Sequence, residues 1–120
     1  MPQLQHFANQ RQYQRFKTKN RAFAMLADWT IKFDIIDISK NGLSFLYLGK
    51  AQWFDELSEL DIAYEDGQFL KNIPIISISD STYTNCLIPM RRHSVMFHQL
   101  KPLQQTRLQH LLLFCNKGCA

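Results

Sequence analysis

Residues 31–48 read IKFDIIDISKNGLSFLYL. On either side of Asn41-Gly42, apolar side chains recur at every second position, which is typical of strands with one buried face. The Asn-Gly dipeptide is a strong signal for a tight turn between antiparallel strands. The stretch therefore predicts two antiparallel strands at residues 30–37 and 43–48, joined by a bend over residues 37–42.

Stretches of similar length and period recur through the rest of the chain. They predict further strands at residues 22–29, 58–65, 69–79, 85–91 and 93–98. Six or seven short strands joined by brief turns leave many edges, and closure or stacking of the sheet is needed to hide them. The sequence therefore predicts a mainly β fold, either an antiparallel β-barrel or a β-sandwich.

The C-terminal stretch has a helical period instead. Pro102 suits the first position of a helix, where its missing N–H has no partner to lose. Apolar residues then recur at helical spacing: Leu103, Leu108, Leu111, Leu112 and Cys115. We expect this helix to cover one barrel opening, because an apolar stripe on a terminal helix is usually part of the core. The alternative is that the stripe forms a dimer face.

The chain has 120 residues, of which 46% are hydrophobic, enough for one domain with a modest core. Its longest apolar run, residues 22–27, falls far short of the roughly 18 residues that indicate a membrane span. Residues 1–10 are polar and lack the apolar centre of a signal peptide. Three cysteines are too few for a disulfide framework, and reduced thiols fit a reducing compartment. We therefore expect a cytoplasmic protein with no membrane insertion.

Charge is distributed unevenly along the chain, although the net charge is only +4. Residues 1–27 hold five lysines and arginines and no acid, and residues 81–120 hold five more, again with no acid. All ten acids lie in residues 28–80, beside four basic residues. The two basic ends should attract an anionic partner.

The first of two short motifs lies in the basic N-terminal segment, where Arg11 and Arg15 stand four residues apart. In an extended arm they face the same way, about 13 Å apart. A guanidinium makes paired hydrogen bonds to phosphate and matches the O6 and N7 acceptors of guanine, which lysine does not. Tyr13 lies between the arginines and is a candidate for stacking on a base. Taken alone, such a pair is usually a solvated basic arm.

The second motif is Asp37-x-Ser39-x-x-Gly42, at the predicted bend. Asp37 and Ser39 lie two residues apart at a strand end, so their side chains should share a face. A carboxylate and a hydroxyl suit the N–H edge of guanine. Taken alone, the motif is ordinary turn chemistry. The two motifs together favour a guanine dinucleotide as the ligand.

In this order, and with Arg15 and Asp37 22 positions apart, the motifs resemble the PilZ domain, a bacterial receptor family for cyclic di-GMP. The resemblance extends to residues 42–45, 73–78 and 91–97. It implies a six- to seven-stranded antiparallel PilZ-like β-barrel with a flexible N-terminal arm and a C-terminal α-helix. The corresponding division of this chain is an arm at 1–21, a barrel at 22–100 and a helix at 101–116.

The resemblance also implies a site and a function. Arg11 and Arg15 would hold the phosphates and guanine edges of cyclic di-GMP, and the opposing barrel surface would be formed by Asp37, Ser39 and Gly42. In the family the arm is mobile when empty and folds across the barrel when the ligand arrives. The implied chemistry is recognition and a switch, with the signal passing to an unidentified effector protein.

Two positions depart from the family pattern. Gln10 and Gln12 flank Arg11, where family members often carry a further arginine, which bears on whether one or two ligand molecules bind. Ser94 stands where the family frequently has glycine, which concerns strand packing more than ligand contact.

Two alternative functions remain open. An OB-type barrel would bind single-stranded nucleic acid through the basic arm and its aromatic residues, with a steep dependence on salt. We favour it less, because the arginine pair is matched by the second motif. A PilZ-like adaptor that contacts only protein is the other alternative, although such relatives usually lack the arginine pair, which this chain has.

Catalysis and metal binding have little support in the sequence. The chain lacks a phosphate-binding glycine loop, a nucleophile elbow and a helical pair of metal ligands, and its four histidines are scattered. A metal set could be imagined from His110, Cys115 and Cys119, but their spacing matches no common zinc site. We therefore expect a protein that is not an enzyme and holds no metal.

Overall fold

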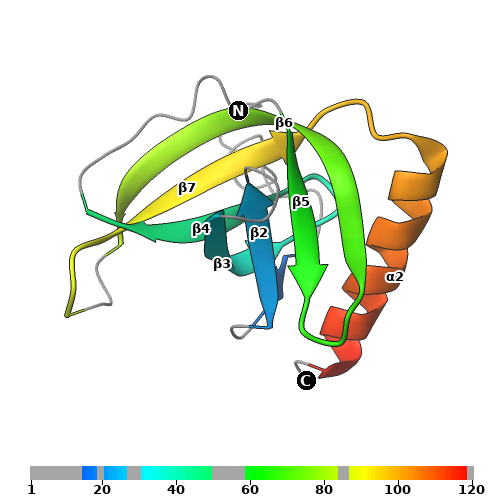
Figure 1. Ribbon diagram of the computed structural model, residues 1–120, viewed down its shortest axis with the longest axis horizontal. Helices are drawn as coiled ribbons and strands as arrows, with labels where there is room; N and C mark the ends of the chain where they lie inside the picture. The colour runs from blue at the N-terminus through cyan, green and yellow to red at the C-terminus, as the bar shows by residue number, and fades with distance from the viewer. Residues whose placement is uncertain (1–14, 19–20, 27–30, 50–58, 84–86, 119–120) are drawn as a thin grey trace, which may run out of the picture.

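The computed structural model describes residues 15–18, 21–26, 31–49, 59–83 and 87–118. These residues form seven strands and one helix (Figure 1). The elements are β1 Phe16–Lys17, β2 Ala22–Leu26, β3 Ile31–Ile38, β4 Gly42–Leu48, β5 Glu59–Tyr64, β6 Phe69–Tyr83, β7 Met90–Phe97 and α2 Pro102–Gly118. Most of the expected N-terminal arm falls outside the described residues. In the part of the chain that is described, no helix has the length and apolar character needed to cross a membrane.

The strands close into a barrel. They are all antiparallel, in the order β1-β3-β2-β5-β6-β7-β4, and β4 pairs back onto β3. Strands β2 to β7 thus form the closed barrel, and β1 is an outer strand beside the end of β3. Helix α2 lies along the side of β6 (Figure 1). The predicted antiparallel barrel with a C-terminal helix is confirmed, as is the bend between β3 and β4.

One part of the strand prediction is wrong. The sequence predicts two strands at residues 85–91 and 93–98, whereas the structure has the single strand β7. Arg92 pairs with Leu46 of β4 and Ser81 of β6, so the ladder runs through it on both sides. A charged residue between two apolar stretches therefore marks an outward-facing strand position here and not a turn.

The barrel core is filled by inward-facing residues of the strands and by one face of α2. The largest fully buried apolar side chains include Phe45, Ile35, Ile62, Ile73 and Leu111. Four residues of the predicted helical stripe are buried within this chain: Leu108, Leu111, Leu112 and Cys115. Leu103, the fifth, is 63% exposed in the first turn of α2. The helix thus packs on the barrel, as expected, and that packing buries four of the five residues of the stripe.

A polar cluster centred on Asp80 joins β4, β6 and β7. Its carboxylate accepts hydrogen bonds from Arg91 Nε at 2.5 Å and from the Tyr47 hydroxyl, and it lies 3.0 Å from His93 Nδ1. The other ring nitrogen of His93 lies 2.9 Å from Ser77 Oγ. His93 is fully buried against Phe45, and the Asp80 side chain is 7% exposed. These contacts satisfy a carboxylate that would be costly to bury alone.

The cluster alters the acidity of Asp80. Burial of the carboxyl raises its pKa, but hydrogen bonds from Tyr47, Arg91 and His93 outweigh that effect and hold the pKa below the ordinary value of 3.8. Because the unfolded chain binds this proton more readily, the ionised carboxylate stabilises the fold above the ordinary pKa. This stabilisation is lost as the pH falls through the lower pKa of the folded state.

We expect Asp80→Asn to lower the free energy of unfolding at neutral pH by about 1–2 kcal/mol, because an amide cannot replace the charge-assisted hydrogen bonds that the carboxylate accepts from Arg91 and Tyr47. Urea unfolding of both proteins measures the difference. The gap should narrow as the pH is lowered below the ordinary pKa of 3.8 and through the lower pKa of the folded state, since the wild-type carboxylate then becomes protonated. The same substitution at the exposed Asp34 is the matched control, with a change within about 0.5 kcal/mol. A gap that does not change with pH would contradict this account of Asp80.

Gly42 begins β4 where that strand runs close to β7. A Cβ built on Gly42 would lie 2.2 Å from the backbone carbonyl oxygen of Val95, which no real side chain tolerates. The residue opposite it in the ladder is Met96. Glycine is therefore required here by the approach of a neighbouring strand and not by a left-handed backbone.

Gly42→Ala should lower the free energy of unfolding by about 2 kcal/mol, because the two strands must separate to admit the methyl group. Chemical denaturation checks this, with Ser81→Ala on the exposed side of β6 as a control that should change little. Stability equal to that of the wild type would mean that β4 and β7 are not held this closely.

Candidate functional site

Asp37 reaches the outer surface of the barrel because of an irregularity in β3. The register shifts between Ile35, which pairs with Phe45, and Asp37, which pairs with Ser44. Side chains alternate along a strand, so without the shift Asp37 would share the inward face of Ile35. The bulge reverses the phase, and both Ile35 and Ile38 are fully buried in the core. The carboxylate between them faces outward.

A polar row crosses the barrel wall at the level of Asp37. Residues that are directly opposite in neighbouring strands place their side chains on the same face. The pairings run in sequence across five strands: Lys17, Asp37, Ser44, Ser94 and Ser79. The hydroxyls of Ser44 and Ser94 lie 2.7 Å apart. The adjacent row of Ile38, Leu43 and Val95 is buried in the core, which assigns the polar row to the outer face.

Two arginines bind the carboxylate of Asp37. Arg15 Nη1 lies 3.1 Å from Oδ1, and Arg92 Nη2 lies 3.0 Å from Oδ2. The Asp37 side chain is 5% exposed, whereas the side chains of Arg15 and Arg92 are 35% and 29% exposed. The three groups together carry one net positive charge next to a buried acceptor. Such a group can bind an anion and can also read hydrogen-bond donors.

Ser39 holds the turn between β3 and β4. Its Oγ accepts hydrogen bonds from the backbone N–H of Asn41 at 3.1 Å and of Gly42 at 3.2 Å. Its own N–H donates to the carbonyl of Gly42 at 2.8 Å. The side chain is buried, so in this structure the hydroxyl fixes the shape of the turn that follows Asp37.

The structure brings four of the predicted site residues together and leaves two undescribed. The four are Arg15, which binds Asp37, and Ser39 and Gly42, which form the adjoining turn. Arg11 and the candidate stacking residue Tyr13 lie outside the described residues.

Arg92 belongs to the site but was missed by the sequence reasoning. Adjacent residues of a strand point to opposite faces. Arg91 turns inward to Asp80, and Arg92 turns outward to Asp37. Two adjacent arginines in one strand indicate that one of them faces outward. The predicted break between residues 91 and 93 concealed this, because it placed the two arginines outside a continuous strand.

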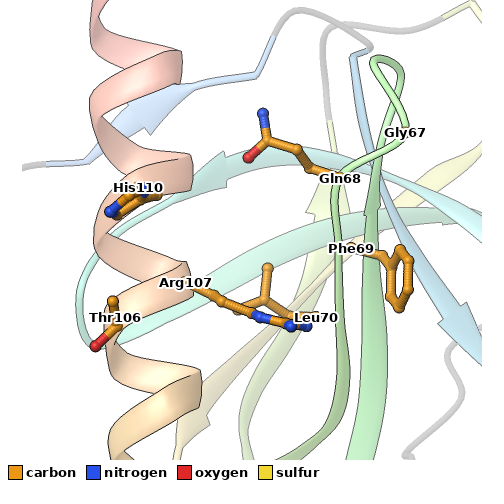
Figure 2. Close-up of a pocket in the computed structure, with 7 residues that line it drawn as sticks. All are labelled: Gly67, Gln68, Phe69, Leu70, Thr106, Arg107 and His110. Carbon is orange, nitrogen blue, oxygen red and sulfur yellow. The ribbon is translucent and has the colours of Figure 1, made fainter.

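A separate hollow of about 340 Å³ lies between α2 and the turn that joins β5 to β6 (Figure 2). It is lined by Gly67, Gln68, Phe69, Leu70, Thr106, Arg107 and His110. Figure 2 shows Arg107 extending from α2 towards Leu70. Of the motif residues that the structure describes, none is part of this lining.

A metal centre is not assembled by the described residues. Among them, no group of three histidine, cysteine or acidic side chains lies close enough to hold an ion. Cys115 is buried in the core, whereas His110 is exposed on α2. Cys119, the third member of the imagined set, lies outside the described residues.

Comparison with known proteins identifies the fold through structure and not through sequence. No protein-family model matches the sequence, and no curated protein matches it. The solved PilZ domain of YcgR from Escherichia coli superimposes with a TM-score of 0.65 at 22% identity, covering 91% of this chain and 93% of that one.

Two further structures are similar to this chain. MrkH of K. pneumonia in its apo state gives a TM-score of 0.68 at 16% identity, covering 88% of this chain and 51% of MrkH. PlzA of Borreliella burgdorferi gives 0.58 at 13% identity, covering 98% of this chain and 57% of PlzA. This chain therefore spans about half of the longer proteins and nearly all of the isolated YcgR domain. The closed barrel, the outer strand and the C-terminal helix of this chain have the PilZ fold.

Proposed function

We propose that this protein is a receptor for cyclic di-GMP that passes a signal to a partner protein. The observation that carries the proposal is the outward-facing carboxylate of Asp37, bound by Arg15 and Arg92 on the wall of a PilZ-fold barrel. Its predicted ligand contacts are Arg11, Arg15, Asp37, Ser39 and Gly42.

The chemistry of the site matches a guanine dinucleotide. The two carboxylate oxygens of Asp37 can accept hydrogen bonds from the N1–H and N2–H donors of guanine. The arginines can bind a phosphodiester or the O6 and N7 acceptors of the base. The surplus positive charge of the site favours a ligand with two phosphodiesters.

Similar structures support the same ligand. The YcgR domain was solved with c-di-GMP, and MrkH and PlzA were each solved in complex with c-di-GMP. MrkH is also described as a c-di-GMP dependent transcription regulatory factor, which is a property of that protein. Because these structures share less than a quarter of their residues with this chain, the ligand is carried over here as part of the proposal.

The remaining features of the receptor follow from the sequence and stay predictions. They are an arm at 1–21 that folds over the ligand, a barrel at 22–100, a helix at 101–116 and stacking by Tyr13. We further propose that the protein acts by recognition and signalling, that it is not an enzyme and that it is located in the cytoplasm. The effector protein is unidentified.

Calorimetric titration of the protein with cyclic di-GMP tests the proposal. Saturable binding at micromolar concentration, about −8 kcal/mol, is the expected result, with no comparable binding of GTP. A single-stranded oligonucleotide titrated at two salt concentrations separates the nucleic-acid alternative, whose affinity should fall steeply with salt. Binding of the oligonucleotide without binding of cyclic di-GMP would overturn the proposal in favour of an OB-type barrel that binds single-stranded nucleic acid. Binding of neither would favour a protein-only adaptor.

Arg15→Ala should weaken binding of cyclic di-GMP by about 2–5 kcal/mol, because the ligand loses charge-assisted hydrogen bonds in a partly desolvated site. The same calorimetric titration measures the loss. Arg107→Ala removes an equal charge from α2, in the separate hollow, and should leave the affinity nearly unchanged. Equal binding by the wild type and Arg15→Ala would refute the site assignment.

A further inference from the structure

Asp37 has two arginine partners, although one positive charge is enough to compensate its buried carboxylate. Its carboxylate is almost fully buried, so loss of every partner would leave an uncompensated charge. One guanidinium is enough to prevent that, yet Arg15 and Arg92 each bind a different oxygen of the group. One of the two arginines can therefore leave Asp37 without leaving the carboxylate unpaired.

The two arginines differ in how firmly the backbone holds them. Arg92 lies within the eight-residue strand β7 and pairs with β4 on one side and β6 on the other. Arg15 precedes β1, which pairs with β3 over two residues. Their side chains are similarly exposed, at 29% and 35%, so exposure does not distinguish them. Backbone anchoring does, and it makes Arg92 the fixed partner.

We propose that Arg92 is a positioning residue that holds Asp37 for guanine recognition, and that Arg15 exchanges from Asp37 to the ligand on binding. This inference rests on the proposed function. With Arg15 moved, Oδ1 becomes free to accept from guanine while Arg92 keeps Oδ2 in place. The exchange keeps Asp37 paired throughout and supplies a cation to the phosphodiester.

The inference predicts a role for Arg92 in base selectivity. Asp37 reads the N1–H and N2–H donors of guanine only if its carboxylate is correctly oriented. Cyclic di-IMP is a suitable probe, because its base keeps N1–H and lacks the N2 amino group. A site that reads both donors discriminates against the analogue, because one of the hydrogen bonds that the buried carboxylate accepts from the base is then lost.

The experiment is a calorimetric titration of cyclic di-GMP and cyclic di-IMP into four proteins: wild type, Arg92→Ala, Arg92→Lys and Arg107→Ala. We expect Arg92→Ala to lose at least about tenfold in affinity for cyclic di-GMP and to lose most of its preference over cyclic di-IMP. Arg92→Lys keeps the positive charge but lacks the planar set of N–H donors of a guanidinium. Compared with Arg92→Ala, it should therefore recover part of the affinity and less of the selectivity. Arg107→Ala should match the wild type.

A second readout follows the exchange itself. In nuclear magnetic resonance spectra of the guanidinium groups, cyclic di-GMP should shift the Nε–H signal of Arg15 strongly and that of Arg92 little. If Arg92→Ala does not fold, Arg92→Lys and this spectrum of the wild type carry the test.

The possible outcomes separate the inference from the function. Failure of the wild type to bind cyclic di-GMP would refute the proposed function. Wild-type binding with unchanged affinity and selectivity in Arg92→Ala would refute only the role of Arg92. A uniform loss of affinity for both dinucleotides, with the preference intact, would also refute positioning, because it would reduce Arg92 to a general attractive charge. A large shift of Arg92 with Arg15 unmoved would overturn the exchange.

Discussion

The bulge in β3 between Ile35 and Asp37 is the constraint on which the site depends. It allows Ile35 and Ile38 both to fill the core and turns Asp37 to the outer wall. In a regular strand side chains alternate strictly, so with Ile35 in the core the carboxylate of Asp37 would also face inward and Ile38 would face outward. The turn fixed by Ser39 and the close approach at Gly42 then hold β3, β4 and β7 together beside that carboxylate.

Two adjacent arginines of β7 bind carboxylates on opposite sides of the barrel wall. Arg91 binds Asp80 on the inner side, in a cluster that satisfies the buried His93. Arg92 binds Asp37 on the outer side, where Arg15 binds the other carboxylate oxygen. The strand β7 thereby connects the polar interior to the candidate site. In the proposed receptor, a strand that is paired on both sides would hold Arg92, and with it Asp37, in place before the ligand binds.

Local patterns in the sequence predicted most of the strands, the helix and a mainly β fold, and the resemblance of the two motifs selected the barrel. Neither predicted the whole site. Alternation and Asn41-Gly42 predicted β3, β4 and their bend, and helical spacing predicted α2. The two predicted strands around Arg92 were wrong, because a charged outward residue resembles a break when only the sequence is read. The bulge could not be predicted, because it depends on how neighbouring strands pair. The pairing of Arg92 with Asp37 spans 55 positions and likewise required the closed barrel.

The most direct test of the central claim is a crystal structure of the protein with cyclic di-GMP. The account predicts a guanine edge within about 3 Å of the Asp37 carboxylate, with Arg15 on the ligand and Arg92 still on Asp37. A ligand bound elsewhere, for example in the hollow beside Arg107 and His110, would contradict it. So would a guanine that approaches the barrel without contacting Asp37.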